Sequence, residues 1–319
     1  MIRRIQVRAP CRLHFGMFSF GNADRPQYGG VGVMVDPPAV ELTITPLEHF
    51  AAKGALSERA NQYANSLVQR WRLGSLPACE IFVASPPDHV GLGVGTQLGL
   101  AIASGLRRFL DLPDLSIEEL SSSVGRGVRS AVGTYGFRHG GLIVDAGKKP
   151  GQPLGALAHR AALPAEWRVV LVRPGDAQGL AGDYEADAFA RLPPVADEVT
   201  RELWRITEQE MLPSVERADC GTFGEAVYRF GRLAGACFAP VQGGPFATAE
   251  TSRLVESIRD YGVPGVGQSS WGPTVFAFTA SAAEGQSLCE RLRTLLSIPA
   301  DEIIIARPDN RGAQISVLS

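Results

Sequence analysis

A glycine-dense loop between a strand-like and a helix-like segment is the part of this sequence best suited to chemistry. Three glycines alternate with other residues in the string PPDHVGLGVGTQLG at residues 86–99. Glycine permits positive φ angles and a close approach of the backbone to a ligand, and free N–H groups at a helix start attract anions. We therefore expect a phosphate-binding loop, with a tight turn that only packs the helix on the strand as the alternative. The candidate contacts to phosphate are Gly91, Gly93, Gly95, Thr96 and Gln97, and Thr96 is also a candidate cap of the helix.

A second glycine loop, VPGVGQSSWGPTVF at residues 263–276, comes just before an apolar strand. It places Gln268, Ser269 and Ser270 between glycines, a polar composition that is unusual for a protein core. We expect these three side chains and Trp271 to line a cleft opposite the first loop, with Ser269 as a candidate catalytic residue. The alternative is an irregular loop that packs around Trp271.

Basic side chains stand in the first strand-like segment. Arg12 and His14 are two residues apart in RLHFG, and alternate residues of a strand point to the same face. A guanidinium group can hold phosphate or carboxylate, and a histidine with a pKa near neutrality can move a proton. We expect both residues to be catalytic, while a half-buried histidine with a structural role is the alternative. A glycine-rich GGVGV string follows at residues 29–33.

A second basic cluster surrounds the string SAVGTYGF at residues 130–137. Arg126 and Arg129 precede this string, and Arg138 and His139 follow it. Arg126 and Arg129 are candidate contacts to phosphate or carboxylate, and His139 is a second candidate for proton transfer. A solvated basic face is the alternative.

The overall composition is that of an ordinary soluble protein. The chain has 319 residues, of which 45% are hydrophobic and 20% charged, and its net charge is -2. Without a basic excess, nucleic acid is not expected as a partner. Five scattered cysteines, an odd number, argue against a disulfide framework and a zinc site. We recognise no signal peptide and no apolar run of the roughly 18 residues that a membrane span needs, so we expect a cytoplasmic protein.

Periodic patterns indicate the elements that must position these residues. Alternation predicts short strands in IQVRAP, RLHFGMF, VGVMVD and AVELTITP, and further strands at 79–84, 141–145, 167–172, 274–279, 302–307 and 312–318. Apolar residues at helical spacing predict helices at 58–73, 96–110, 196–211, 222–238, 248–261 and 282–296. Ser116 and Glu119 form a capping-box pattern that opens another helix.

A polar, turn-rich segment at residues 148–153 is the best candidate for a domain boundary. We expect an N-terminal domain at residues 1–152, which carries the phosphate loop, and a C-terminal domain at residues 153–319. The order of strands and helices predicts an α+β protein with helices packed over a sheet.

The order of the glycine-rich and basic segments resembles the galactokinase–homoserine kinase–mevalonate kinase (GHMP) superfamily. An A-P-x-R segment, a central G-L-G loop and a C-terminal glycine-rich loop recur there, and they stand here at residues 9–16, 87–96 and 265–273. The resemblance spans the chain. It implies an α+β, GHMP-kinase-like two-domain fold, with an N-terminal domain like domain 2 of ribosomal protein S5 and a ferredoxin-like C-terminal domain.

One departure from this superfamily concerns its nucleotide site. Where the kinases carry two serines after G-L-G, this chain has Val94 and Gly95, and neither can help to hold a magnesium nucleotide. The segment 126–137 also lacks the aspartate that serves as a base in several members. An ATP-dependent kinase of a small alcohol is therefore the second hypothesis for this chain, and a non-catalytic homologue that binds a phosphate ligand is the third.

Five strings are similar to one branch, the β-ribofuranosylaminobenzene 5'-phosphate synthase family of tetrahydromethanopterin biosynthesis. They are RLHFG, GGVGV, HVGLGVGTQL, GRGVRSAVGTYGF and GQSSWGPT. The resemblance implies a pentosyltransferase that joins phosphoribosyl diphosphate to 4-hydroxybenzoate or 4-aminobenzoate and releases CO2 and diphosphate. It also implies Mg2+ and a homodimer. Asp145, Asp183 and Glu185 are carboxylates available to the metal, but the sequence assigns no ligand.

Overall fold

Two long antiparallel strands, β1 (Arg4–Met17) and β2 (Gly30–Pro46), form the spine of the molecule. The computed structural model describes residues 4–173, 187 and 189–318. The sequence predicted a pair of short strands in place of each of these long ones, and this was wrong. The register between the two strands shifts at Pro10/Cys11 and again at His14/Gly16, so irregularities in the ladder absorb the proline and the glycine without ending the strand.

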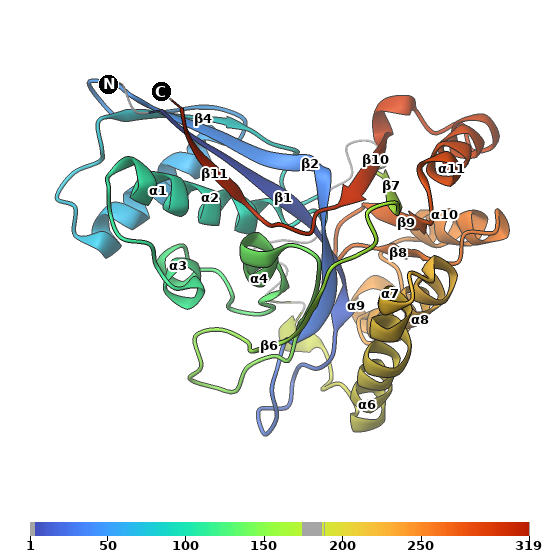
Figure 1. Ribbon diagram of the computed structural model, residues 1–319. Helices are drawn as coiled ribbons and strands as arrows, with labels where there is room; N and C mark the ends of the chain where they lie inside the picture. Colours follow the sequence, from blue (N-terminus) through green and yellow to red (C-terminus); the bar gives the residue numbers. More distant parts are fainter. Residues whose placement is uncertain (1–3, 174–186, 188, 319) are drawn as a thin grey trace.

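The N-terminal half of the molecule is a sheet covered by helices. Strands β3 (Ala51–Gly54), β4 (Cys79–Ala84), β5 (Leu142–Asp145), β6 (Leu157–Ala161) and β11 (Gln314–Leu318) complete the sheet around β1 and β2. The covering helices are α1 (Ser57–Trp71), α2 (Val94–Phe109), α3 (Ile117–Ser123) and α4 (Val132–His139). In Figure 1 these helices lie together on one side of the strands. Leu98, Ile102 and Leu106 of α2 are buried, and each such side chain stabilises the fold by about 1.5–3 kcal/mol.

The C-terminal half has its own antiparallel strands, in the order β10-β7-β9-β8. These are β7 (Arg168–Val172), β8 (Val266–Gln268), β9 (Val275–Thr279) and β10 (Ile303–Pro308). Helices α8 (Cys220–Ala236), α9 (Ala239–Gln242), α10 (Ala249–Asp260) and α11 (Ala282–Leu295) follow in the same half, and a 3-10 turn at Ala300–Glu302 precedes β10. Pairing of β10 with β2, at Arg307 opposite Asp36, joins the two halves into one sheet, which has eleven strands in the part of the chain that the structure describes.

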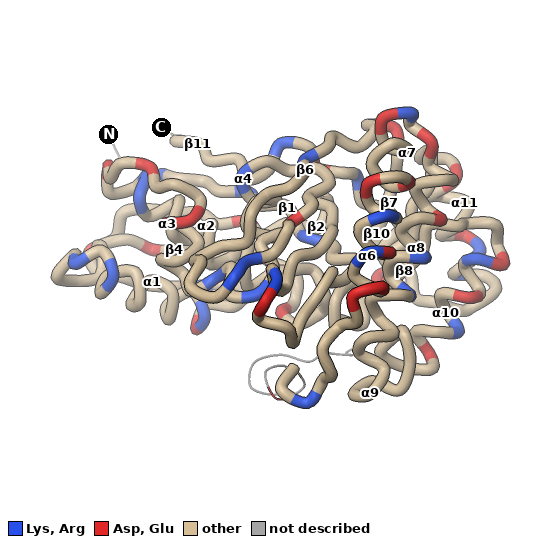
Figure 2. The backbone as a smooth tube through the Cα atoms, turned by 90° about the horizontal axis from the view of Figure 1, so that it is seen from below, with Lys and Arg blue, Asp and Glu red and all other residues tan. Residues whose placement is uncertain are grey.

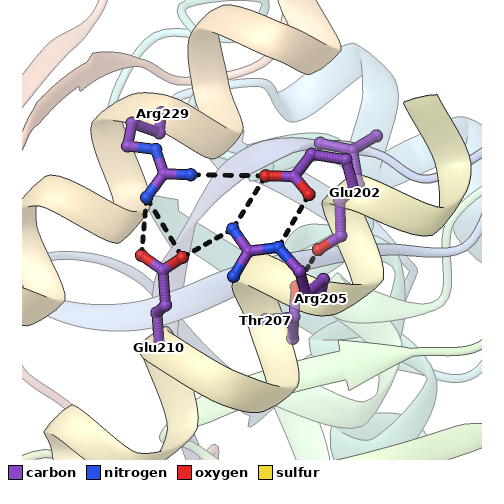
Figure 3. Close-up of polar contacts among 6 residues, drawn as sticks. Glu202, Arg205, Thr207, Glu210 and Arg229 are labelled. Atoms are coloured by element: carbon purple, nitrogen blue, oxygen red, sulfur yellow. Dashed lines mark hydrogen bonds and ion pairs between the residues drawn. The ribbon is translucent and has the colours of Figure 1, made fainter. Parts of the chain in front are cut away.

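The segment from 197 to 216 is less regular than its sequence pattern. The structure divides the single helix predicted at 196–211 into α6 (Asp197–Ile206) and a π-helical turn at Thr207–Met211, which α7 (Leu212–Glu216) continues. Figure 3 shows the ion pairs that tie this turn to α8. Arg205 contacts Glu202 and Glu210, both at 2.7 Å, and Arg229 contacts Glu210 at 2.8 Å. These groups are partly exposed, so the network contributes little to stability.

Most of the predicted elements occur within a few residues of their predicted bounds, and the mixed α+β class is confirmed. The predicted domain boundary at 152/153 lies in the connection between β5 and β6, two strands that pair with each other. The chain also returns to the N-terminal sheet at its end, because β11 pairs with β1. The two-domain division therefore stays a prediction. No helix in the described part of the chain is long and apolar enough to cross a bilayer.

Candidate active site

Hydrogen bonds join the three segments that the sequence singled out. The amide of Arg12 in β1 donates to the carbonyl of Leu92 at 2.9 Å. The hydroxyl of Ser269 accepts from the amide of His14 at 3.0 Å and donates to the carbonyl of Gly91 at 2.6 Å. Ser269 therefore couples β1, the first glycine loop and the second glycine loop at a single point. This explains why the three segments, which are far apart in the sequence, meet in one place.

A cleft of about 1020 Å³ opens where these segments meet. Ten of the predicted site residues line it: Arg12, His14, Gly91, Gly93, Gly95, Thr96, Arg126, Arg129, Ser270 and Trp271. The sequence did not single out the other polar side chains in the lining: Ser57, Glu58, Arg59, Gln62, Asp88, His89 and Ser130. Figure 2 shows Lys and Arg segments gathered near the middle of the molecule, between α1 and the C-terminal helices. A cleft with four arginines suits a ligand with several negative charges.

The first glycine loop leads directly into α2, whose first turn faces the cleft. Gly93 is the N-cap, with φ of 67°, so the helix begins at Val94 and not at Thr96 as predicted. A Cβ atom at Gly95 would lie 2.7 Å from a guanidinium nitrogen of Arg59 and 3.1 Å from one of Arg126. Glycine at this position therefore lets two guanidinium groups lie over the start of the helix. Helix amides and two cations converge there, which is an arrangement for binding an anion.

Other side chains hold these two arginines in place. The Nε of Arg126 donates to the hydroxyl of Tyr63 at 3.0 Å, and this hydroxyl donates to the carbonyl of Gly95 at 2.8 Å. Arg59 forms an ion pair with Asp88, which lies in the glycine loop. Both guanidinium groups are thus fixed on the protein before a ligand arrives, and this lowers the entropic cost of binding.

A chain of three polar side chains runs from the cleft into the protein. The Nε2 of His14 lies 3.0 Å from the hydroxyl of Ser130, and this hydroxyl lies 3.4 Å from a carboxylate oxygen of Asp145. His14 is 3% exposed and Asp145 is fully buried. Gly30 makes room for the neighbouring strand and for the imidazole, because a Cβ atom there would lie 2.4 Å from the carbonyl oxygen of Gly16 and 3.0 Å from Cε1 of His14. One glycine of the GGVGV string is thereby explained.

The environment shifts the pKa of both ends of this chain. Burial, together with the positive charge of Arg12, holds the pKa of His14 well below its usual value. Burial raises the pKa of Asp145 to about 6, although hydrogen bonds from the amides of Ala131 and Gly147 oppose the shift. At neutral pH His14 is therefore neutral and Asp145 is ionised.

These protonation states determine which ring nitrogen of His14 carries the proton. An ionised carboxylate only accepts hydrogen bonds, so the single hydroxyl proton of Ser130 is directed to Asp145. The Ser130 oxygen then accepts from Nε2–H of His14. This leaves Nδ1 of His14 with its lone pair, as the basic atom of the ring.

Four of the predicted site residues lie elsewhere than expected. Gln97 does not line the cleft, because it is fully buried and donates to the carbonyl of Gly133 at 2.9 Å. His139 is exposed at the C-terminal end of α4 and lies outside the cleft lining. The side chains of Ser269 and Gln268 are buried and bonded within the protein, so they do not form a wall of the main cleft. Ser269 connects the loops, and Gln268 lines a smaller neighbouring pocket.

Carboxylates for a metal ion are scarce in this cleft. Among the described residues no group of three His, Cys, Asp or Glu side chains converges. In the described lining of the cleft the carboxylates are Glu58 and Asp88, and Asp88 is paired with Arg59. Asp145 is occupied by two backbone amides, at 2.6 and 2.8 Å, and Asp183 and Glu185 lie outside the described residues. The described side chains therefore do not form a resident Mg2+ site.

Comparison with known proteins identifies full-length relatives. A family model described as GHMP kinases C terminal matches residues 211–298. A β-ribofuranosylphenol 5'-phosphate synthase from Archaeoglobus fulgidus is 32% identical, over 98% of this chain and 100% of its own length. The protein of the same name from Methanothermobacter thermautotrophicus is 27% identical, over 88% of this chain and 90% of its own length.

Solved structures with the same fold are more distant in sequence. Homoserine kinase from Cytophaga hutchinsonii superposes with a TM-score of 0.66 at 15% identity, over 98% of this chain and 97% of its own. Mevalonate pyrophosphate decarboxylase from Streptococcus pyogenes superposes with a TM-score of 0.69 at 11% identity, over 96% and 97% of the two chains. Likeness at this level concerns the fold alone. Together with the family model, it confirms the predicted GHMP-type α+β fold.

Proposed function

Because the chain belongs to the β-ribofuranosylphenol 5'-phosphate synthase family, we propose that it joins phosphoribosyl diphosphate to 4-hydroxybenzoate, with release of CO2 and diphosphate, in tetrahydromethanopterin biosynthesis. The observation that carries this proposal is the full-length relation to synthases of that name, in a chain whose main cleft contains four arginines. The phenol in the relatives' name favours the hydroxy acid, and 4-aminobenzoate is the alternative acceptor.

The reaction breaks one bond at ribose C1 and one bond at a ring carbon of the acceptor, and it forms a new bond between these two carbons. The bond between ribose C1 and the diphosphate oxygen breaks, and diphosphate leaves with the electron pair. A carbon–carbon bond forms between C1 and the ring carbon that carries the carboxylate. The bond from that ring carbon to the carboxylate then breaks, its electrons return to the ring, and CO2 leaves. The protein must stabilise the departing charge and keep water away from the electron-poor C1.

We assign the diphosphate to the start of α2. The amides of its first turn, Arg59 and Arg126 supply positive charge at one point. The diphosphate carries more negative charge than the 5-phosphate, so it gains most from this site. Arg12 and Arg129 also line the cleft and are the candidate contacts to the 5-phosphate or the carboxylate.

His14 is the proposed base for the acceptor. A phenol that gives up its proton pushes electron density to the ring carbon para to the oxygen, which is the carbon that attacks C1. Neutral His14 can take this proton at Nδ1 and return it after CO2 has left. Ser130 and Asp145 act through His14 as positioning residues, because they fix the tautomer that keeps Nδ1 basic.

We propose that Mg2+ enters as part of the substrate, bound to the diphosphate. A hard cation of this kind usually keeps several waters and one or two carboxylates besides phosphate oxygens. Glu58 and Asp88 are the carboxylates of the cleft. The homodimer and the cytoplasmic location predicted from the sequence stay predictions.

A product assay separates the proposed reaction from its rivals. The protein is incubated with Mg2+, phosphoribosyl diphosphate and 4-hydroxybenzoate, and in parallel with Mg2+, ATP and small alcohols. The proposal predicts diphosphate and CO2 in the first mixture and no ADP in the second. ADP formation without diphosphate release supports a kinase, and binding of phosphoribosyl diphosphate without any turnover supports a non-catalytic homologue.

A further inference from the structure

A smaller apolar pocket opens beside the arginine-lined cleft. The two spaces share four lining residues: His14, Met17, Ser270 and Trp271. We infer that this side pocket binds the hydroxyl-bearing end of the aromatic acceptor, an inference that rests on the proposed function. The reacting end of the ring then remains in the main cleft, next to the phosphoribosyl group.

The lining of the side pocket suits a flat, uncharged ring. Phe15, Phe238, Phe246 and Trp271 contribute aromatic surface. The rings of Phe238 and Trp271 meet edge to face, with centroids 4.7 Å apart. No Arg or Lys lies in the described lining of this pocket. Burial of a phosphate or a carboxylate there would be costly, because nothing would compensate its charge, whereas a phenol ring gains from such contacts.

The size of the side pocket determines how far the ring enters. It holds about 50 Å³. An engineered cavity of roughly 150 Å³ binds one benzene molecule, so the side pocket accepts only part of a ring. The neutral hydroxyl end enters, and the charged carboxylate stays outside among the arginines. The ring carbon that carries the carboxylate is then placed where the two spaces meet, facing the position of ribose C1.

Polar atoms in the side pocket can receive the hydroxyl proton. Gln268 is committed, since its Oε1 accepts from the amide of Ala247 at 2.8 Å and its Nε2 donates to the carbonyl of Ser270 at 2.9 Å. The Nε2 of Gln242 donates to the carbonyl of Gly244 at 2.8 Å. Within the described lining, the side chains left with an acceptor atom are those of His14, Gln242 and Ser270. This position of the hydroxyl agrees with His14 as its base.

Helix α8 supplies two glycines and one alanine, Ala234, to the wall of the side pocket. Gly231 and Gly235 lie one helical turn apart and both line the side pocket. A Cβ atom at Gly235 would lie 2.1 Å from the carbonyl oxygen of Pro245, whereas one at Gly231 would meet only the carbonyl oxygen of Phe15, at 3.7 Å. Gly231 therefore has room for a Cβ atom, and we expect a larger side chain at this position to narrow the space for the ring.

The test compares Gly231→Ala and Gly231→Leu with Gly221→Ala and Gly221→Leu, matched controls in the same helix. Gly221 lies outside both spaces, and a Cβ atom there has only ordinary contacts. Binding of 4-hydroxybenzoate and of Mg2+–phosphoribosyl diphosphate is measured separately by calorimetry, together with both KM values. Melting curves check the folding of every variant, and Gly→Ala in a helix should raise stability.

We expect Gly231→Leu to raise the KM for 4-hydroxybenzoate by about 10-fold or more and to leave binding of phosphoribosyl diphosphate within about twofold, with Gly231→Ala in between. An unchanged acceptor KM in a Gly231→Leu enzyme that still turns over overturns the side-pocket assignment and leaves the proposed function standing. An equal loss for both substrates also overturns the assignment. If the wild type binds the acid but makes no product, and Gly231→Leu does not bind the acid, the side-pocket assignment is supported and the proposed reaction is wrong. If the wild type neither binds nor consumes the acid, both fall.

Discussion

The Nε2 of His14 lies 3.0 Å from the hydroxyl of Ser130, although 116 positions separate the two residues in the chain. This contact links a cleft-lining histidine to the buried carboxylate of Asp145. It gives the histidine a defined tautomer, and with it a defined basic atom.

Removal of the Ser130 hydroxyl should slow the reaction without weakening substrate binding. In Ser130→Ala the tautomer of His14 is no longer fixed, so kcat should fall by about 10- to 100-fold while the KM for phosphoribosyl diphosphate changes little. Ser123→Ala is the control, because Ser123 is a buried serine outside the cleft lining whose hydroxyl donates to the carbonyl of Leu120 in α3. Steady-state kinetics of both variants decide. If Ser130→Ala raised the KM and left kcat unchanged, Ser130 would serve only to bind substrate.

The pH profile of kcat/KM should report the ionisation of Asp145. Its raised pKa, to about 6, means that activity falls as the pH drops through that value, because protonated Asp145 no longer orients Ser130. His14 cannot cause this limb, since burial holds its pKa well below the ordinary value. In Asp145→Asn the fall in activity near pH 6 should disappear. Above this pH the variant should have the same low activity that the wild type has when Asp145 is protonated. An unchanged limb in this variant would assign the titration to another group.

The same carboxyl should affect stability in the opposite direction. The folded state binds the Asp145 proton more tightly than the unfolded chain does, because the pKa rises from 3.8 to about 6 on folding. This group alone therefore lowers the free energy of unfolding as the pH rises between those two values. Urea unfolding of the wild type and of Asp145→Asn across this range should show the larger decline in the wild type. Equal slopes would mean that the carboxyl is not desolvated.

The two arginines over the start of α2 should dominate binding of the charged substrate. Arg59→Ala or Arg126→Ala should each raise the KM for phosphoribosyl diphosphate by about 10-fold or more, as expected for loss of a charge-assisted contact. Arg108→Ala is the control, because Arg108 is exposed in the last turn of the same helix. Both KM values should be measured at two salt concentrations. If neither variant raised the KM for phosphoribosyl diphosphate more than the control did, the assignment of the diphosphate to this site would be wrong.

We expect Gly93 to affect substrate binding through its position at the cleft, in addition to its effect on stability through a positive φ. Gly93 and Gly74 have φ of 67° and 76°, so alanine at either should cost about 1–2 kcal/mol of stability. A Cβ atom at Gly93 would lie 3.1 Å from Cβ and Nε of Arg12, whereas one at Gly74 would meet nothing within 4 Å. Only Gly93→Ala should therefore weaken binding of phosphoribosyl diphosphate, as calorimetry can measure. If both variants bound phosphoribosyl diphosphate equally well, Gly93 would serve only to form the turn.

The sequence was most informative where residue type determines backbone geometry. Alternate glycines between a strand and a helix predicted the anion loop, and the spacing of Arg12 and His14 predicted that both reach the cleft, as they do. Arg59 could not be found in this way. It lies on α1, where an amphipathic pattern accounts for a polar residue without any role, and only the folded chain brings it over Gly95.

The misplaced residues follow from helices whose bounds or existence the sequence did not reveal. Helix α2 begins at Val94, two residues earlier than predicted, and Gln97 at the end of its first turn is fully buried. The short helix α4 was not predicted. It places His139 about 12 Å, at 1.5 Å per residue, from the end that reaches the cleft. The buried position of Ser269 depends on contacts with β1 and the first glycine loop, which no local pattern contains.

The stoichiometry of the two leaving groups tests the central claim most directly. Wild-type protein is given Mg2+, phosphoribosyl diphosphate and 4-hydroxybenzoate labelled in its carboxyl carbon, and labelled CO2 and diphosphate are counted in the same reaction. Transfer of the ribosyl group to the carboxylate-bearing carbon predicts one CO2 for each diphosphate. Diphosphate released without labelled CO2, or neither product from an enzyme that binds both substrates, would contradict it.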